Sequence, residues 1–257
     1  HSTLVSYHRP RSRHAEAFRG LRTALYFNAH VGQHKVIQVT SPNPKDGKST
    51  LAANLAVCMA QSGKKVMLVD CDFRNSTIHK LFALGNSVGV SNVIAGEEEL
   101  PDVIQSVDIE NLSILPCGPH PPNPSELLTS PKFDELVELL SEKYDLIIID
   151  SPPMLAVSDP STIASRVDGV LLVVRITKDG RPEAVQAKQF LTSVGAEMLG
   201  VVVNSWQQDR GYGYGYYGRK YGYGYGYGYG YGYGEKDSEY YGDEETATTR
   251  LSSAGSG

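Results

Sequence analysis

The sequence predicts an α/β fold with a mostly parallel central sheet and helices on both of its faces. Three observations support this prediction. Several segments are solid runs of apolar, often β-branched residues, which is the pattern of strands buried on both faces. Helix-forming segments alternate with these runs, as they do in sheets built from strand–helix–strand units. Finally, the runs ending at Asp70 and Asp150 both finish in a carboxylate, at the sheet edge where such folds bind ligands.

The individual elements follow from local patterns. A first helix over residues 15–29 places Phe18, Leu21 and Leu25 on one face, and Gly32 lies just past its end. Glycine and proline separate most of the later elements. We expect strands at 36–39, 65–70, 112–115, 144–150, 170–174 and 200–203, helices at 51–60, 75–83, 91–94, 125–141 and 182–193, and a stiff proline-rich loop at 119–124.

The segment from Val36 to Thr50, VIQVTSPNPKDGKST, is organised like a phosphate-binding loop. A buried strand leads into a tight loop, and the next helix opens directly after it. The first amides of a helix lack backbone partners and point towards an anion. Gly47 lets the backbone approach the phosphates, Lys48 supplies a charge for the β- and γ-phosphates, and the Ser49 hydroxyl is a Mg²⁺ ligand. The segment therefore predicts a nucleotide site.

This loop departs from the common pattern G-x-x-x-x-G-K-[ST], because Pro42 stands where the first glycine is expected. Pro42 and Pro44 donate no amide. The alternative is a chance Gly-Lys-Ser in a basic loop, and the strand before it and the helix after it argue against chance. Asn204, at the end of the last strand, is a candidate for adenine contact. The phosphate cradle is expected to come from Lys45, Asp46, Gly47, Lys48, Ser49 and Thr50.

Carboxylates at two strand ends complete the candidate site. Asp70 and Asp72 end one strand, and Asp150 ends another, in the place of the second P-loop acid that holds Mg²⁺ directly or through water. We expect Asp72 and Asp150 to bind the metal together with Ser49. Asp70 is the candidate proton acceptor, in a role that can be exchanged with Asp72. The alternative for Asp70 and Asp72 is a helix N-cap and a salt bridge to Arg74.

Composition limits the class of protein. A length of 257 residues suffices for one α/β domain with extensions, and a net charge of −5 argues against a nucleic-acid-binding core. The three cysteines form no C-x-x-C pair, which indicates a reducing compartment. No apolar run reaches the roughly 18 residues of a membrane span, and no secretory signal is present.

The two ends of the chain differ from its middle. Residues 1–14 are polar and basic, and we expect a flexible leader that is either a solvated tail or a juxtamembrane segment. From Gly211 to Gly234 the chain is almost wholly glycine and tyrosine, and thirteen of the sixteen tyrosines lie after Arg210. Such a segment buries too little surface to order its backbone, so we expect disorder.

The motifs SPNPKDGKST, VMLVDCDFR and LIIIDSPP, in this order, resemble those of the bacterial tyrosine kinases that control capsule and exopolysaccharide export. The loop LPCGPHPPNPSELL and the C-terminal tyrosine cluster are also similar to that family. Glu16, Arg19 and Arg22 match its E-x-x-R-x-x-R oligomerisation motif and repeat along one side of the first helix. The resemblance covers about residues 14–241.

The resemblance implies a protein-tyrosine kinase that uses ATP and Mg²⁺ and autophosphorylates its tail in trans within a ring of subunits. Its implied partners are a membrane-spanning activator, fused upstream or separate, and a tyrosine phosphatase, at the cytoplasmic face of the inner membrane. The implied division is a basic leader with an oligomerisation helix at 1–33, a P-loop kinase domain of three-layer sandwich type at 34–209, and a disordered tail at 210–257. The implied catalytic residues are Lys48, Asp70, Asp72 and Asp150, and the phosphoacceptors are Tyr212, Tyr214, Tyr216, Tyr217, Tyr221, Tyr223, Tyr225, Tyr227, Tyr229, Tyr231, Tyr233, Tyr240 and Tyr241.

Two other classes of protein share parts of this pattern. A partitioning or positioning ATPase would carry a signature lysine five residues before the P-loop lysine, where this chain has Asn43. An assembly protein would use the Gly-Tyr tract for self-association or for stacking on RNA. Only Arg219 and Lys220 supply positive charge inside the tract, and the acidic end that follows argues against nucleic acid as a partner.

Overall fold

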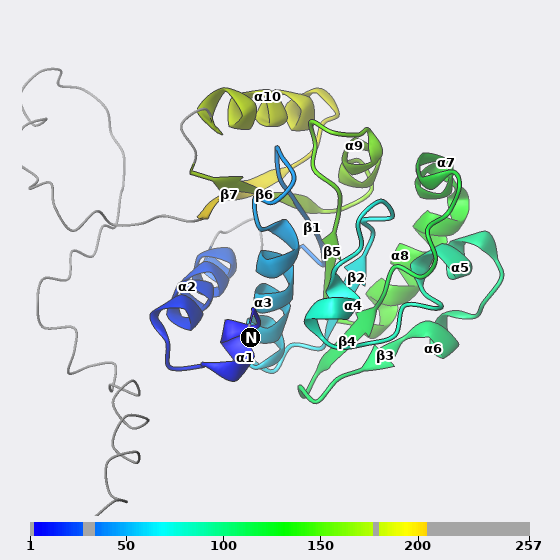
Figure 1. The fold of residues 1–257 in the computed structure, drawn as a ribbon, viewed down its shortest axis with the longest axis horizontal. Coiled ribbons are helices and arrows are strands. Elements are labelled where there is room, and N and C mark those ends of the chain that lie inside the picture. The colour runs from blue at the N-terminus through cyan, green and yellow to red at the C-terminus, as the bar shows by residue number, and fades with distance from the viewer. Residues whose placement is uncertain (1–2, 28–33, 177–179, 205–257) are drawn as a thin grey trace, which may run out of the picture.

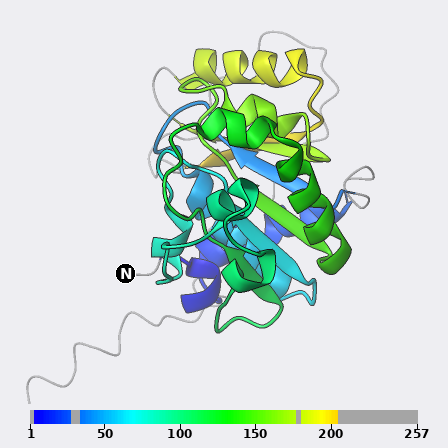
Figure 2. The ribbon, with the colours of Figure 1, turned by 90° about the vertical axis from the view of Figure 1, so that its right-hand side faces the viewer.

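The computed structural model describes residues 3–27, 34–176 and 180–204. These residues form one sheet with helices on both faces, so the predicted three-layer α/β class is confirmed (Figures 1 and 2). The expected disordered tail at 210–257, with all its tyrosines, lies outside the described residues.

The sheet has seven strands in the order β3-β4-β2-β5-β1-β6-β7. Every neighbouring pair is parallel except β3 and β4, which are antiparallel. Buried apolar side chains fill the central strands on both faces, as the solid apolar runs predict. The strands are β1 (Val36–Thr40), β2 (Val66–Asp70), β3 (Gln105–Ser106), β4 (Leu112–Leu115), β5 (Leu146–Asp150), β6 (Gly169–Arg175) and β7 (Met198–Asn204).

The strand order brings three loops together at one edge of the sheet. β1 lies between β5 and β6, and β2 lies on the other side of β5. In this register Asp150 is the backbone partner of both Val39 and Asp70. The P-loop after β1 and the acids that end β2 and β5 therefore meet at the carboxyl ends of the strands, where open α/β sheets bind ligands.

The helices complete two outer layers. They are α1 (Val5–His8), α2 (Arg13–Phe27), α3 (Lys48–Ala60), α4 (Ile78–Leu81), α5 (Val90–Ala95), α6 (Leu100–Val103), α7 (Pro124–Thr129), α8 (Pro131–Lys143), α9 (Asp159–Ala164) and α10 (Gly180–Ser193). Apolar residues of α2, α3 and α4 pack on one face of the sheet, and those of α5 to α9 pack on the other. α10 packs beside α9 at the β6–β7 end (Figure 1).

The expectation of a flexible leader is wrong for residues 3–14. Residues 3–9 fold against α3, and α2 begins at Arg13. Leu4 is buried, and the Ser6 amide donates to Asn54 Oδ1 over 2.9 Å. In return the Asn54 amide donates to the carbonyl of Thr3. The physical reason is that α3 is apolar around its whole circumference and buries this one asparagine, whose polar atoms need partners.

Helix boundaries also differ from the prediction. The expected helix at 125–141 is two helices, because Pro131 starts α8 and its ring disfavours helical backbone at Ser130. Within the expected helix at 75–83, only the residues of α4 are α-helical. The short elements α6, β3 and α9 were not predicted from the sequence, since none is long enough to show a period. No helix in the described part of the chain is long and apolar enough to cross a membrane.

Candidate active site

The P-loop ends in a helix N-terminus that faces a cavity. Lys45 and Gly47 both have positive φ, 69° and 96°, which bends the loop tightly before Lys48 opens α3. Glycine adopts this conformation without strain, whereas a lysine does not. The backbone amide of Asn43 donates to Asp46 Oδ2 over 2.9 Å, which further constrains the loop. The loop from Lys45 onwards is therefore sharply turned, and its role as a phosphate cradle stays a prediction.

Asn204 is placed against this loop from the end of β7. Its side-chain amide donates to the carbonyl of Asp46 over 2.8 Å. A Cβ atom added at Gly47 would lie 2.2 Å from the same Asn204 nitrogen. The close approach requires glycine at position 47, so Asn204 helps to fix the backbone that opens α3. Its predicted contact with adenine stays a prediction.

Lys48 and two of the predicted acids meet at the mouth of the loop. The Lys48 ammonium lies 2.7 Å from Asp72 Oδ2 and 3.7 Å from Asp150 Oδ1, and it donates to the Ser49 hydroxyl over 3.1 Å. Burial of the ammonium acts to lower its pKa, but Asp150 and Asp72 together hold the pKa of Lys48 above its ordinary value. Lys48 therefore stays charged in the site.

Asp150 is fully buried, and neither of its carboxylate oxygens has a hydrogen-bond partner among the described residues. Burial raises the pKa of Asp150 to about 6, against the opposing charge of Lys48. A buried carboxylate without partners is costly unless something else binds it. Because Ser49 and Asp72 also offer oxygen atoms beside Lys48, this set of ligands suits Mg²⁺, which prefers one or two carboxylates plus phosphates and water.

Asp70 is occupied by the backbone. Its oxygens accept the amides of Asp72, Thr77 and Ile78, each over 3.1 Å, so it holds the turn that leads into α4. Burial raises the pKa of Asp70 to about 7, and the charge of nearby Asp150 adds to the rise. Asp70 thus accepts amides at the start of α4, which agrees in part with the N-cap alternative given for Asp70 and Asp72. The salt-bridge alternative is wrong, since Arg74 pairs elsewhere.

Arg74 is held by a buried acid that sequence reasoning missed. Its Nε donates to Asp159 Oδ2 over 2.8 Å, and the Ser125 hydroxyl donates to the other oxygen over 2.6 Å. The Arg74 and Ser125 hydrogen bonds lower the pKa of Asp159 against the effect of its burial. The only signal in the sequence was an Asp-Pro pair at a helix start, which does not reveal a partner 85 residues away.

A cavity of about 550 Å³ runs across these groups. Its charged lining residues are Lys45, Lys48, Asp72 and Arg74, and Pro152 and Pro153 also line it. This volume lies within the range of small-molecule sites. A cavity with three cations, a helix N-terminus and an acid beside the central lysine fits a polyphosphate. Asp70 does not line it.

Comparison with known proteins decides the family. Residues 34–180 match the family described as "AAA domain". The chain is 38% identical over 201 residues to the tyrosine-protein kinase YwqD of Bacillus subtilis, covering 78% of this chain and 85% of that protein. The chain belongs to the bacterial tyrosine-protein kinase family.

Solved structures agree with this assignment. The kinase domain of the Escherichia coli tyrosine kinase ETK superposes with a TM-score of 0.76 at 34% identity, over 86% of this chain and 85% of that one. The septum site-determining protein MinD of Pyrococcus horikoshii, solved with Mg-ADP, gives a TM-score of 0.58 at 26% identity, over 66% of this chain and 69% of that one. The kinase therefore has a P-loop NTPase-type fold.

The predicted oligomerisation residues of the kinase lie together on α2. Arg19 Nε donates to Glu16 Oε2 over 2.7 Å, and Arg22 donates to the Cys58 carbonyl at the end of α3 over 3.3 Å. These three side chains are thus ordered within a single chain. Their contact with a second subunit stays a prediction.

Proposed function

We propose that this kinase transfers the γ-phosphate of ATP to the tyrosines of its own C-terminal tail, in trans between subunits of a ring. The observation that carries the proposal is the convergence of Lys48, Asp72 and Asp150 at a helix N-terminus, next to a cavity lined by cations. The tail tyrosines listed above are the acceptors, because they are numerous and alternate with glycine, which leaves each ring accessible.

The phosphates of ATP would lie on the amides from Lys45 to Thr50, with Asn204 at the adenine. Lys48 would leave Asp72 for the β- and γ-phosphates, where its charge balances that developing in the transition state. Ser49, Asp72 and Asp150 would hold Mg²⁺ directly or through water, and the ion would neutralise phosphate charge. The buried oxygens of Asp150, which lie near Lys48 but have no hydrogen-bond partner among the described residues, support this role.

A tyrosine hydroxyl with a pKa near ~10 needs a proton acceptor at neutral pH. In the transfer step its oxygen bonds to the γ-phosphorus, the bond from that phosphorus to the β-phosphate oxygen breaks, and ADP leaves. We assign the phenolic proton to Asp72, which in this role would hold Mg²⁺ only through water, with Asp70 as the residue that positions it. The assignment is supported by the place of Asp72 on the cavity wall, whereas Asp70 is fully buried and accepts three backbone amides.

We further propose that this activity controls exopolysaccharide or capsule polymerisation and export at the cytoplasmic face of the inner membrane. A membrane-spanning activator, fused upstream or separate, would switch the kinase on, and a tyrosine phosphatase would reset the tail. Nucleic acid is not among the proposed partners. This part rests on the family resemblance and on the E-x-x-R-x-x-R residues of α2.

The test is incubation of the full chain with ATP and Mg²⁺, followed by mass spectrometry of the tail. Phosphotyrosine after Arg210 supports the proposal. ATP hydrolysis without tail modification would contradict it and favour a nucleotide-dependent switch instead, as in the partitioning ATPases.

A further inference from the structure

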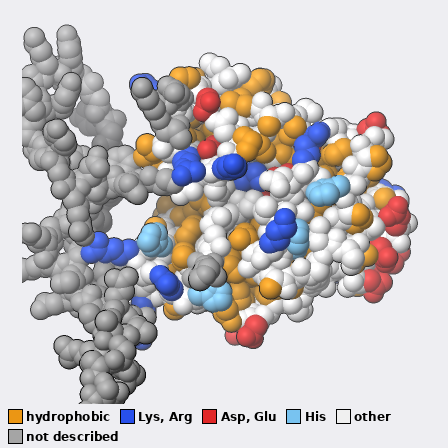
Figure 3. Space-filling model, in the orientation of Figure 1, with side chains coloured by type: hydrophobic (Ala, Val, Ile, Leu, Met, Phe, Trp, Pro, Cys, Tyr) orange, Lys and Arg blue, Asp and Glu red, His pale blue; other side chains and the backbone are white. Residues whose placement is uncertain are grey.

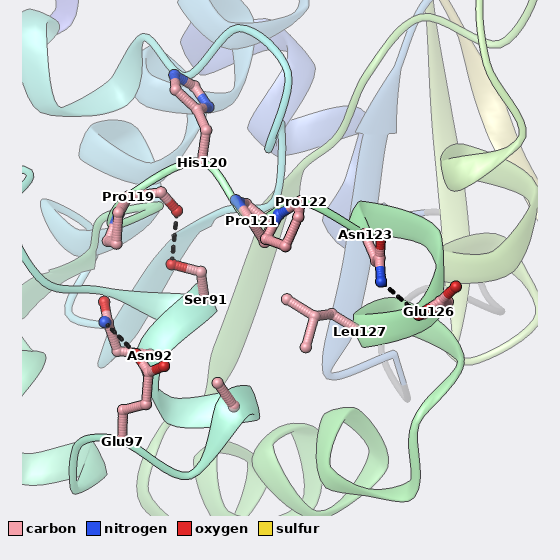
Figure 4. Close-up of a pocket in the computed structure, with 11 residues that line it drawn as sticks. Ser91, Asn92, Glu97, Pro119, His120, Pro121, Pro122, Asn123, Glu126 and Leu127 are labelled. Atoms are coloured by element: carbon pink, nitrogen blue, oxygen red, sulfur yellow. Dashed lines mark hydrogen bonds between the residues drawn. The ribbon is translucent and has the colours of Figure 1, made fainter.

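A second cavity, of about 430 Å³, is drawn with its lining residues in Figure 4. It is bounded by α5, by the loop Pro119–Asn123 and by the start of α7. Its apolar surface comes from Ala95, Leu127, Pro121 and Pro122. We call it the proline cavity. Neither the proposed transfer step nor the nucleotide site uses it.

Hydrogen bonds and prolines hold the walls of the proline cavity in place. The Ser91 hydroxyl donates to the carbonyl of Pro119 over 2.9 Å, and a ring nitrogen of His120 is within hydrogen-bond distance of the Phe73 carbonyl. Prolines lock φ and stiffen the rest of the loop. Proline-rich segments of this kind pack against aromatic side chains, because their shape is set without loss of entropy. The cavity is therefore suited to a flat ring.

The proline cavity and the catalytic cavity have opposite charge. None of the 11 residues that line the proline cavity is lysine or arginine, and two of them, Glu97 and Glu126, are carboxylates. The catalytic cavity has Lys45, Lys48 and Arg74. Acidic side chains also gather at the right-hand edge of the molecule near α5 and α6 (Figure 3). A phosphate carries about −1.5 to −2 charges at neutral pH, so it suits one cavity and is repelled by the other.

We propose that the proline cavity is a docking subsite for an unphosphorylated tyrosine of the Gly-Tyr tail, and that it rejects phosphotyrosine. The inference rests on the proposed function, which makes the tail the substrate. The ring would pack on the prolines and Leu127, and its hydroxyl would donate to Glu97 or Glu126. Both carboxylates already accept side-chain amides, from Asn92 and Asn123, which hold them in place (Figure 4).

The spacing of the tail allows both cavities to be used at once. Tyrosine recurs at every second position from Tyr221 to Tyr233, which in an extended chain is a ring every ~7 Å on one side. The two cavities are neighbours through the chain itself, since His120 contacts Phe73 and the next residue, Arg74, lines the catalytic cavity. One tyrosine can thus sit in the proline cavity while another is phosphorylated. As modification proceeds, fewer rings fit and the tail is released.

The proposal is tested by peptide binding to the full-length chain with its tail tyrosines changed to serine, so that the tail does not compete. The probe is a fluorescent peptide of residues 221–234, unmodified or fully phosphorylated, with ADP and Mg²⁺ saturating the catalytic cavity. Ala95→Phe fills the proline cavity from an exposed position. It should weaken binding of the unmodified peptide by about two- to tenfold, the value of one aromatic packing contact.

A second variant tests the charge rule. Glu126→Lys should strengthen binding of the phosphorylated peptide by about two- to tenfold more than Glu138→Lys does. Glu138 is an exposed residue of α8 outside the cavity, so the two variants change net charge equally. Unchanged binding to Ala95→Phe, or equal effects of the two lysine variants, would overturn the proposal. The readout is peptide binding and requires no phosphoryl transfer. A chain that phosphorylates nothing would therefore contradict the proposed function, while its peptide binding would still test the docking subsite.

Discussion

Asp150 lies in a costly environment in the free protein. It is buried, carries no hydrogen bond among the described residues, and relies on Lys48 at 3.7 Å for compensation. Its neighbour Asp70 is buried as well but is satisfied by three amides. The stored cost at Asp150 is relieved when a cation or a proton binds, which ties the stability of the free protein to pH.

We predict that Asp150→Asn stabilises the nucleotide-free protein above neutral pH. Because its pKa is raised from 3.8 to about 6, folded Asp150 holds a proton between about pH 4 and 6 that the unfolded chain has released. This favours folding at low pH and is lost as pH rises through about 6. The Asp150→Asn protein has no such loss, so its melting temperature should exceed that of the wild-type protein by about 2 °C or more at pH 8.

The comparison is made by thermal denaturation of both proteins from pH 5 to pH 8 without nucleotide or Mg²⁺. The difference in melting temperature should shrink towards pH 5. A difference that stays constant across this range would show that Asp150 does not titrate as described.

Sequence patterns predicted the residues that meet at the candidate site but not the residues that hold them in place. Lys48 and Asp150 were found because strand ends and the helix after a P-loop converge in this fold, and the structure brings them together. Asp159 was missed, because its partner Arg74 is distant in sequence and nothing local marks the pair. The contact of Asn204 with Asp46 was missed for the same reason.

At the scale of elements, the docking of the leader on α3 was not predictable from the sequence. The apolar face of α2 was visible in the sequence, whereas the docking of residues 3–9 depends on Asn54, a buried polar residue whose partners the sequence does not reveal. The break between α7 and α8 was also missed, because the apolar repeat of residues 125–141 continues across Pro131. Long buried strands were predicted best, because their pattern does not depend on a partner.

We predict that replacing Glu16, Arg19 and Arg22 with alanine gives a monomer that phosphorylates its tail poorly. These charges lie along one side of α2, and losing subunit contact removes the high effective concentration of the neighbouring tail. The rate at micromolar protein should fall by about tenfold or more. The control is Thr23→Ala, an exposed change on the same helix. Light scattering that shows an unchanged oligomer would refute this interface.

At the scale of the whole molecule, the proposed function makes the tail both a substrate and a source of charge. The unphosphorylated chain has a net charge of −5, and each phosphate adds about −1.5 to −2 charges. Several phosphates would join Glu235, Asp237 and Glu239 in an already acidic segment. Crowded tails in one ring would then repel one another.

We therefore predict that changing successive tail tyrosines to glutamate dissociates the oligomer gradually. The effect should follow total charge and should be partly reversed by added salt, because exposed charges are screened within about a Debye length. Sedimentation at several salt concentrations measures it. Dissociation that depended on a single tyrosine, whatever the total charge, would contradict this account of release.

The most direct test of the central claim, transfer from the Lys48 site to a neighbouring tail, is one mixing experiment. A Lys48→Met chain with an intact tail is incubated with ATP and Mg²⁺, alone and together with a chain that keeps Lys48 but has its tail tyrosines changed to phenylalanine. Tail phosphotyrosine is then measured by mass spectrometry. The account predicts no phosphotyrosine on the Lys48→Met chain alone and clear phosphorylation of its tail in the mixture. Phosphorylation of the Lys48→Met chain alone at the wild-type rate, or none in the mixture, would contradict it.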